Sequence, residues 1–380
     1  MGYFIDVKIS NKIVALVLCI ALLLPCLTGC GDKDKDKDKG STAKAKTSQT
    51  SGKSQSSSSS GTSSTAGKGT SSSSGGKVSS NNTAGKTTRR YTTKPPQTTP
   101  PPAANAPYAA PVIYPTVASG AIVYANEKAT IDASNTSDGY VMIKYTGSIP
   151  KVKVLITKGT TYQYDLNVSG NYEVFPLTLG SGTYTVQVCE HVSGQDYSVA
   201  QSAEINVSLS SVFAPFLRPN QFVNYYARTS PVLKAADLCT GYSTDLQKLD
   251  RIYNFVINYL SYDYNKAETV QSGYLPDLNS VYAQRKGICF DYASMMTAML
   301  RSQNIPCKLV IGWARSSPES IYHAWINVYI RNQGWINGAI YFDGNSWKLM
   351  DPTFASTGNS SKAIMDYINN TSNYSAVYYY

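Results

Sequence analysis

Hydrophobic and polar positions divide this 380-residue chain into four stretches of different character. A continuous apolar run at residues 13–24 comes first, and residues 31–106 then contain almost no apolar side chains. Residues 112–209 alternate in short apolar and polar runs, whereas the chain beyond residue 211 mixes helical and strand periodicities. This succession predicts an α+β protein in which an all-β sandwich and a mixed domain follow a disordered tether.

The changes of pattern also place the expected boundaries. We expect a cleaved signal peptide at residues 1–29 and a Ser/Thr/Lys/Pro-rich tether at residues 30–107. A β-sandwich then occupies residues 108–210, and the mixed domain occupies residues 211–380.

The alternating region predicts a series of short antiparallel strands. Turn signals rich in Gly, Ser and Asn separate several of the runs. The predicted strands are 121–125, 140–145, 152–157, 161–168, 172–178, 183–191 and 203–209. Their spacing is typical of a β-sandwich of about one hundred residues. The sequence assigns this region no chemistry, and we expect it to serve in spacing or binding.

Two helices are predicted in the mixed domain. Thr244 and Gln247 have the form of a capping box, and an apolar stripe continues to Leu260. The second helix is expected over residues 290–303, where apolar side chains recur at helical spacing before Asn304 and a proline end it. Asn304 is suited to the left-handed conformation that often closes a helix.

Three residues of this domain have the types needed for thiol catalysis. Cys289 lies two residues after Gly287 and opens the second helix, where the helix dipole favours a thiolate. His323 lies in a run rich in aromatic and β-branched residues that predicts a strand, and Asp351 ends a further short strand before a proline. Such a set supplies a nucleophile, a general base and a group that orients the base, provided that the two strands pair. Taken singly, each residue also has a structural interpretation, as a buried thiol, a strand histidine and a turn aspartate.

These motifs resemble those of the transglutaminase-like family, which shares a papain-type Cys-His-Asp arrangement. The resemblance covers residues 245–355. It rests on the stretches around Cys289, the Asn304-Ile305-Pro306 segment, His323-Ala324-Trp325 and Asp351-Pro352-Thr353. It implies a transglutaminase-like or papain-like fold with Cys289 as nucleophile, His323 as general base and Asp351 as its partner.

The resemblance does not identify the reaction. A thiolate that attacks an amide gives an acyl-enzyme, which passes to an amine in a cross-linking enzyme or to water in a cysteine protease or amidase. Two alternatives outside catalysis stay open. One is a catalytically silent surface module that binds peptide or wall material, and the other is a structural lipoprotein in which the sandwich is adhesive.

The N-terminus predicts the location. Lys8 and Lys12 precede the apolar run, and Leu27, Thr28, Gly29 and Cys30 then form a bacterial lipobox. Lipid attachment at Cys30 would anchor the protein to the outside of the bacterial cell membrane. A secretory signal that is cut elsewhere is the alternative.

The distribution of charge and the remaining potential metal ligands limit which classes of partner are expected. Residues 31–106 carry 13 basic and 4 acidic side chains, whereas residues 107–380 carry 19 of each. We therefore expect the tether to meet anionic wall polymers or lipids, the folded part to act on protein or peptide, and no nucleic acid to bind. Cys189 and His191 stand two apart without further ligand candidates nearby, so no metal or cofactor is expected. A disulfide between Cys239 and Cys307 is possible outside the membrane.

Overall fold

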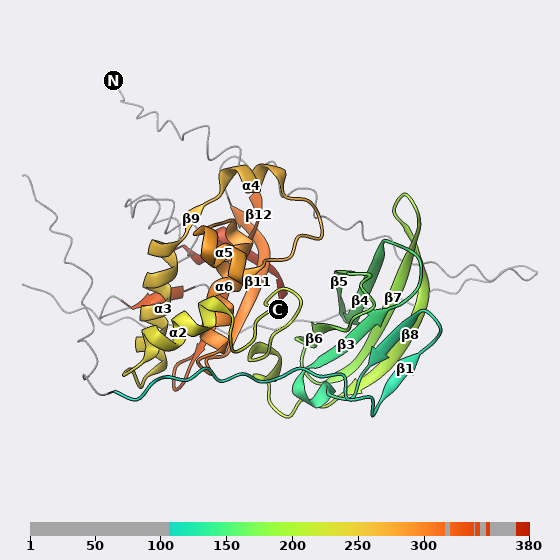
Figure 1. The fold of residues 1–380 in the computed structure, drawn as a ribbon, viewed down its shortest axis with the longest axis horizontal. Helices are drawn as coiled ribbons and strands as arrows, with labels where there is room; N and C mark the ends of the chain where they lie inside the picture. The colour runs from blue at the N-terminus through green and yellow to red at the C-terminus, as the bar shows by residue number, and fades with distance from the viewer. Residues whose placement is uncertain (1–105, 316–319, 338, 343–346, 350–369) are drawn as a thin grey trace, which may run out of the picture. The chain divides into compact units, whose positions relative to one another are not determined.

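The computed structural model describes residues 106–315, 320–337, 339–342, 347–349 and 370–380 (Figure 1). The predicted signal peptide, almost all of the predicted tether, Cys30 and Asp351 lie outside these residues. Within the described part of the chain, no helix is long and apolar enough to cross a membrane.

The first half of the described chain forms two antiparallel sheets of four strands each. One sheet has the order β1-β2-β3-β6 and comprises Val123–Ala125, Ala129–Asp132, Tyr140–Tyr145 and Glu173–Pro176. The other has the order β5-β4-β7-β8 and comprises Thr160–Leu166, Val152–Lys158, Gly182–Ser193 and Asp196–Val207. A short 3-10 helix, η2 (Thr136–Asp138), precedes β3.

Period-two alternation explains why these segments are strands. In β4, for example, Val152, Val154 and Ile156 are buried, whereas the residues between them are partly exposed. Each of the seven predicted strands overlaps an observed one, which confirms the β-rich region ahead of the mixed domain. Strand β2 was not predicted, and β8 begins seven residues before the predicted start at residue 203.

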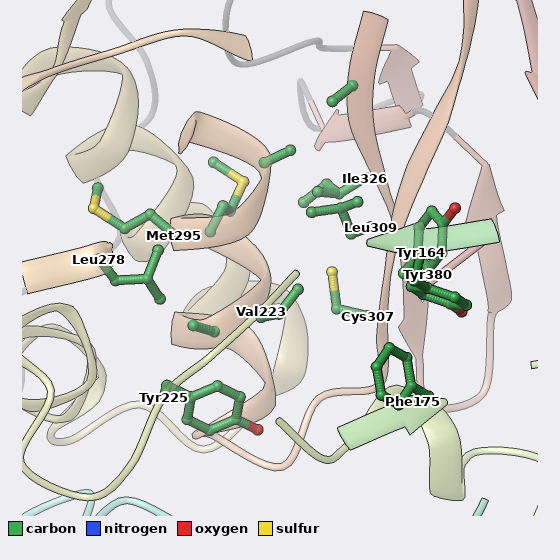
Figure 2. Packing of buried hydrophobic residues seen from close by; sticks show 14 of the residues in the cluster. Tyr164, Phe175, Val223, Tyr225, Leu278, Met295, Cys307, Leu309, Ile326 and Tyr380 are labelled. Carbon is green, nitrogen blue, oxygen red and sulfur yellow. The ribbon is translucent and has the colours of Figure 1, made fainter. Parts of the chain in front are cut away.

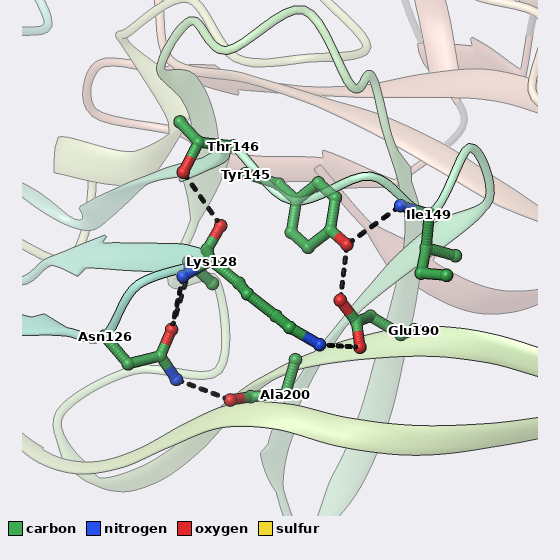
Figure 3. A network of polar contacts seen from close by, with 8 residues as sticks. Asn126, Lys128, Tyr145, Thr146, Ile149, Glu190 and Ala200 are labelled. Carbon is green, nitrogen blue, oxygen red and sulfur yellow. Dashed lines mark hydrogen bonds and ion pairs between the residues drawn. The ribbon is translucent and has the colours of Figure 1, made fainter.

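A buried carboxylate links the two sheets (Figure 3). The Glu190 carboxylate on β7 accepts a hydrogen bond from the Tyr145 hydroxyl of β3 and pairs with the Lys128 ammonium at 2.9 Å. The Tyr145 hydroxyl in turn accepts from the backbone N–H of Ile149 at 3.2 Å. These bonds, the tyrosine hydroxyl first and the lysine second, lower the pKa of Glu190.

The second half of the described chain is mixed. The 3-10 helix η3 (Ala214–Phe216) leads to five helices and several small sheets. The helices are α2 (Ser230–Cys239), α3 (Asp245–Tyr259), α4 (Tyr264–Thr269), α5 (Leu278–Gln284) and α6 (Cys289–Arg301). Helix α3 begins at the predicted capping box, because Thr244 Oγ1 accepts from Gln247 N–H at 3.2 Å.

Three sheets accompany the helices. A four-stranded sheet has the order β13-β12-β11-β16, from Gly334–Asn337, Ser320–Ile330, Cys307–Arg315 and Tyr374–Tyr379. Two two-stranded sheets join β9 (Ser261–Tyr262) to β10 (Lys286–Gly287) and β14 (Ala339–Phe342) to β15 (Trp347–Leu349). A 3-10 helix, η4 (Thr371–Asn373), precedes β16. In Figure 1 the helices gather on one side of β11 and β12.

Helix α6 is the centre of this half and is buried along almost its whole length. Figure 2 shows Met295 pointing from α6 toward Leu278, while Cys307, Leu309 and Ile326 lie on the strand side of the helix. Asn304, just beyond the helix, has a φ of +58°, as predicted for its left-handed conformation.

Aromatic side chains join the two halves into one continuous core. The ring of Tyr164 on β5 packs edge-to-face on Tyr380 and close to Phe222, with centroid distances of 5.7 and 5.4 Å. Tyr162 packs on Tyr378 and its hydroxyl accepts from the backbone N–H of Tyr379 at 3.2 Å. Strand β5 is therefore fastened to the end of the mixed domain.

Candidate active site

Cys289 is the first residue of α6. Ile288 before it has extended dihedrals, so the helix begins directly at the thiol. The first backbone N–H groups of a helix have no acceptor within the helix, and together with the dipole they favour negative charge at this end. The Cys289 residue is only 4 % exposed, yet it lines a pocket.

His323 lies on β12, opposite Gly312 of β11. Its ring stacks near that of Trp325, two residues along the same strand face, with centroids 6.4 Å apart. Gly312 leaves room for this arrangement, because a Cβ there would lie 2.8 Å from the Trp325 ring and 2.2 Å from the Ser375 carbonyl oxygen. Because Gly312 has no side chain, β16 and the Trp325 ring can both approach β11 closely at this position.

Cys289 and His323 line the same pocket, whose volume is about 620 Å³. The two residues are far apart in the sequence, and they come together because α6 packs against β11 and β12. Asp351 lies outside the described residues, so its part in the predicted triad stays a prediction. The condition that the histidine strand pairs with the strand before Asp351 is not met among the described residues, because β12 pairs with β11 and β13 while β15 pairs with β14.

A buried ion pair lies two residues after the thiol. The Asp291 side chain is completely buried, and its Oδ2 accepts from the backbone N–H of Ile288 at 2.8 Å. Lys266 of α4 pairs with the same oxygen at 2.7 Å, and the Tyr274 hydroxyl donates to the other oxygen. The sequence analysis identified neither partner.

The parallel β9–β10 pair brings Lys266 to this place. Gly287 O accepts from Asp263 N–H at 3.0 Å, and Asp263 caps α4. Gly287 also has no room for a side chain, because a Cβ would lie 2.6 Å from that of Asp291. Glycine is therefore needed at position 287 so that the Asp291 side chain can pack against the backbone there.

The sandwich supplies one wall of the pocket. Residues 150–153 and 163–168 of the β4 and β5 region line it, together with the loop 270–275 and Cys289. No sequence signal could have shown this, because the lining comes from strands more than one hundred residues before the thiol. The sequence assigned the sandwich no chemistry and a role in spacing or binding; its residues in the pocket lining are compatible with binding.

Aromatic side chains form another part of the pocket lining. Phe222, Tyr274, Phe290, Tyr322 and Tyr378 line the pocket. Burial raises the pKa of Tyr322 and Tyr274, and the neighbouring Asp291 carboxylate raises that of Tyr274 further. Both phenols are therefore neutral at physiological pH, and the Tyr274 hydroxyl uses its proton in the hydrogen bond to Asp291.

The other thiols and the second histidine lie elsewhere. Cys189, Cys239 and Cys307 are buried, and Cys239 and Cys307 are free of disulfide bonds, so the structure does not form the possible Cys239–Cys307 disulfide. Burial raises the pKa of Cys239 and of Cys307 to about 12. The ring of His191 contacts Tyr197 on the sandwich and does not line the pocket of Cys289. Among the described residues, no three His, Cys, Asp or Glu side chains are grouped as a metal site.

Comparison with known proteins identifies the mixed domain. A family model of the transglutaminase-like superfamily matches residues 234–352, a stretch that contains Cys289, His323 and Asp351. This confirms the family resemblance and the α+β class. No curated protein sequence matches the chain.

Solved structures provide distant likenesses. One is a proposed cysteine protease from Cytophaga hutchinsonii, at 14% identity and a TM-score of 0.31, covering 68% of this chain and 73% of that chain. Another is a proposed protease from Parabacteroides distasonis, at 12% identity and a TM-score of 0.24, covering 59% and 67%. Likeness at this level carries no conclusion about the reaction.

Proposed function

Residues 234–352 belong to the transglutaminase-like superfamily, and from this membership we propose that the chain is a thiol enzyme that forms an acyl-enzyme at Cys289. The observation that carries the proposal is the shared pocket, in which a helix-opening thiol and a strand imidazole are both present. The substrate is an amide of a protein or peptide. The catalytically silent module is the alternative that the experiment below tests.

The proposed chemistry uses groups of this chain only. His323 accepts the thiol proton as Cys289 Sγ attacks the carbonyl carbon, and N–H groups at the start of α6 stabilise the oxyanion. The C–N bond then breaks, the leaving ammonia or amine takes the proton from His323, and a thioester remains. An amine or water resolves the thioester and returns a proton to the sulfur. Asp351 would orient the imidazole.

Labelled amine and mass measurements test the proposal. The protein is incubated with unfolded casein and a labelled primary amine, and the casein products are weighed. Incorporation of the amine with loss of ammonia shows cross-linking chemistry, whereas gain of water shows hydrolysis. We expect one of these with the wild type, none with Cys289→Ala, and full activity with Cys239→Ala, whose thiol is buried in another part of the domain.

Absence of both products, and of any thioester trapped by hydroxylamine, would support the silent module instead. Persistence of the product in Cys289→Ala would show that another group is the nucleophile.

We further propose that Cys30 carries lipid and holds the enzyme on the outer face of the bacterial cell membrane. The lipobox supports this location, and the basic composition of residues 31–106 supports contact with anionic wall polymers. Growth with labelled palmitate tests the anchor: label should enter the wild type and be lost in Cys30→Ser. Label that stays in Cys30→Ser would contradict it.

The contact with wall polymers is tested by binding to isolated cell walls, which should weaken as the salt concentration rises.

A further inference from the structure

Among the strands that the structure describes, only β4 pairs with β5, so β5 is at the edge of its sheet. In an antiparallel ladder, alternate residues turn their N–H and C=O groups toward the partner strand and away from it. Which residues of β5 turn outward follows from two independent hydrogen bonds.

The first bond is on the far side of β4. His191 N–H donates to Lys151 O at 3.0 Å, which shows that Lys151 turns toward β7. Lys153, two residues on, turns the same way, so its partner Asp165 on β5 is not hydrogen-bonded to it. The second bond agrees, because Gln221 Nε2 donates to Asp165 O at 2.7 Å from outside the sheet.

Gln163 and Thr161 alternate with the residues that bond to β4 in the same way as Asp165 does. Their backbone N–H and C=O groups therefore also point away from β4. Asp165 O is occupied by Gln221, but the described structure gives the outward N–H and C=O of Gln163 no partner. Gln163 is half-buried and lines the pocket of Cys289 and His323. Thr161 does not line it.

We propose that the outer edge of β5 binds the substrate as an added strand, pairing through the backbone of Gln163. An unpaired edge with an outward donor and acceptor suits an extended polypeptide, whose own backbone presents the complementary groups. The substrate class is therefore an unfolded or extended segment of protein, not a small amide. This inference rests on the proposed function at Cys289.

The wall beside β5 suits such a segment. A strand added to β5 would place alternate side chains over the face that carries Lys153 and Asp165, which both line the pocket. The sandwich then selects the conformation of the substrate, and the mixed domain carries out the reaction. This arrangement explains why the pocket of a catalytic thiol extends onto a separate sheet.

Proline at position 163 tests the pairing. Gln163→Pro removes the outward N–H and spares the β4–β5 ladder, which does not use it, and edge strands accept proline. Thr161→Pro makes the same change at the same parity but away from the pocket, so it serves as the matched control for the fold. Gln163→Ala keeps the backbone N–H and isolates the side chain.

The readout is the ratio of kcat/KM for unfolded casein to kcat/KM for an N-blocked glutamine dipeptide, which has too few residues to pair as a strand. We expect Gln163→Pro to lower this ratio about tenfold, as loss of one or two hydrogen bonds does. Thr161→Pro and Gln163→Ala should change it by less than about twofold. An unchanged ratio in Gln163→Pro, or an equal fall in Thr161→Pro, would overturn the proposal.

A binding measurement separates this inference from the proposed function. With Cys289→Ala as background, the Kd for unfolded casein is measured with and without Gln163→Pro, so no reaction is needed. A rise of about tenfold in Kd supports strand pairing even if no acyl-enzyme forms. Lack of saturable binding in the Cys289→Ala background, or an equal Kd for both proteins, would overturn the pairing whatever the reaction proves to be.

Discussion

The Lys266 ammonium lies 2.7 Å from the carboxylate of Asp291, which is in the first turn of the helix that begins with Cys289. The contact changes the electrostatic interpretation of the site. From the sequence, Asp291 would oppose a thiolate at position 289. In the structure its charge is compensated by Lys266, and its oxygens are held by Ile288 N–H and the Tyr274 hydroxyl. The carboxylate thus fixes the start of α6 and the loop that lines the pocket.

The first prediction concerns this carboxylate. Asp291→Ala should lower the free energy of unfolding by about 2–4 kcal/mol, because a partly buried cation and two further donors lose their acceptor. Asp291→Asn keeps one acceptor oxygen and should lose less. Denaturant unfolding followed by tryptophan fluorescence measures both.

Asp277→Ala is the matched control. Asp277 caps α5 near the same loop but lies at the surface, so its loss should amount to about 1 kcal/mol. Similar losses for Asp277→Ala and Asp291→Ala would show that the buried ion pair has no special weight.

The second prediction concerns thiol reactivity in the native protein. Cys239 and Cys307 have a pKa raised to about 12 by burial, so their thiolate population near pH 7.5 is on the order of a thousandfold below that of an ordinary thiol. Iodoacetamide should therefore alkylate Cys289 much faster than Cys239 or Cys307. His323→Ala should slow that reaction, because the proton acceptor is gone.

Peptide mass spectrometry after a timed exposure identifies the modified residue, and alkylation in denaturant provides the full signal. Native labelling of Cys307 at the rate of Cys289 would refute the assignment of a single reactive thiol. A rate at Cys289 that is the same in His323→Ala would show that the imidazole does not activate it.

The third prediction is a pH dependence in the sandwich. The Tyr145 hydroxyl and Lys128 hold the pKa of Glu190 below its ordinary value of 4.5. A depressed pKa in the folded state stabilises the fold above the unfolded pKa, and this stabilisation is lost as the pH falls through the folded value. Glu190→Gln should therefore be less stable than the wild type by about 1–2 kcal/mol near pH 7, with a difference that shrinks below about pH 4.5.

Unfolding curves between pH 3 and 7 measure this difference. Glu204→Gln, an exposed change on β8 of the same sheet, should leave the stability unaltered at every pH. A difference between wild type and Glu190→Gln that stays constant with pH would mean that charge is not the source.

The sequence predicted what local pattern controls. Alternation located seven of the eight sandwich strands, and the Thr244 capping box and the apolar spacing after Cys289 located α3 and α6. Strand β2 was missed because it is short and ends at Asp132, a buried polar residue that does not continue an apolar alternation.

The site was predicted only in part, because long-range contacts leave no local signal. Cys289 and His323 were recognised by residue type and order, and the structure brings them to one pocket. Lys266 and Gln163 were not recognised, since each reaches the site through a tertiary contact. Tyr380 shows the same limit: nothing in the sequence around it indicates burial, but its ring is buried against Tyr164.

The last prediction concerns Arg301, the buried residue that ends α6. Its guanidinium donates to Cys307 O at 3.0 and 2.9 Å, to Arg218 O at 2.6 Å and to Tyr380 O at 2.7 Å. It therefore ties the helix to β11, to the link after the sandwich and to the end of the chain. Arg301→Met should lower the free energy of unfolding by about 3–5 kcal/mol, because buried carbonyl groups lose their donors.

Arg331→Met provides the comparison, since the Arg331 side chain is 67% exposed and its buried partner Asp245 keeps the hydrogen bond from the Arg331 backbone N–H. That change should lower the free energy of unfolding by about 1–2 kcal/mol, less than Arg301→Met does. Arg301→Lys should fall between the two, because an ammonium group cannot reproduce the forked bonds to Cys307 O. If Arg301→Met and Arg331→Met unfold at the same denaturant concentration, the buried guanidinium does not hold these segments together.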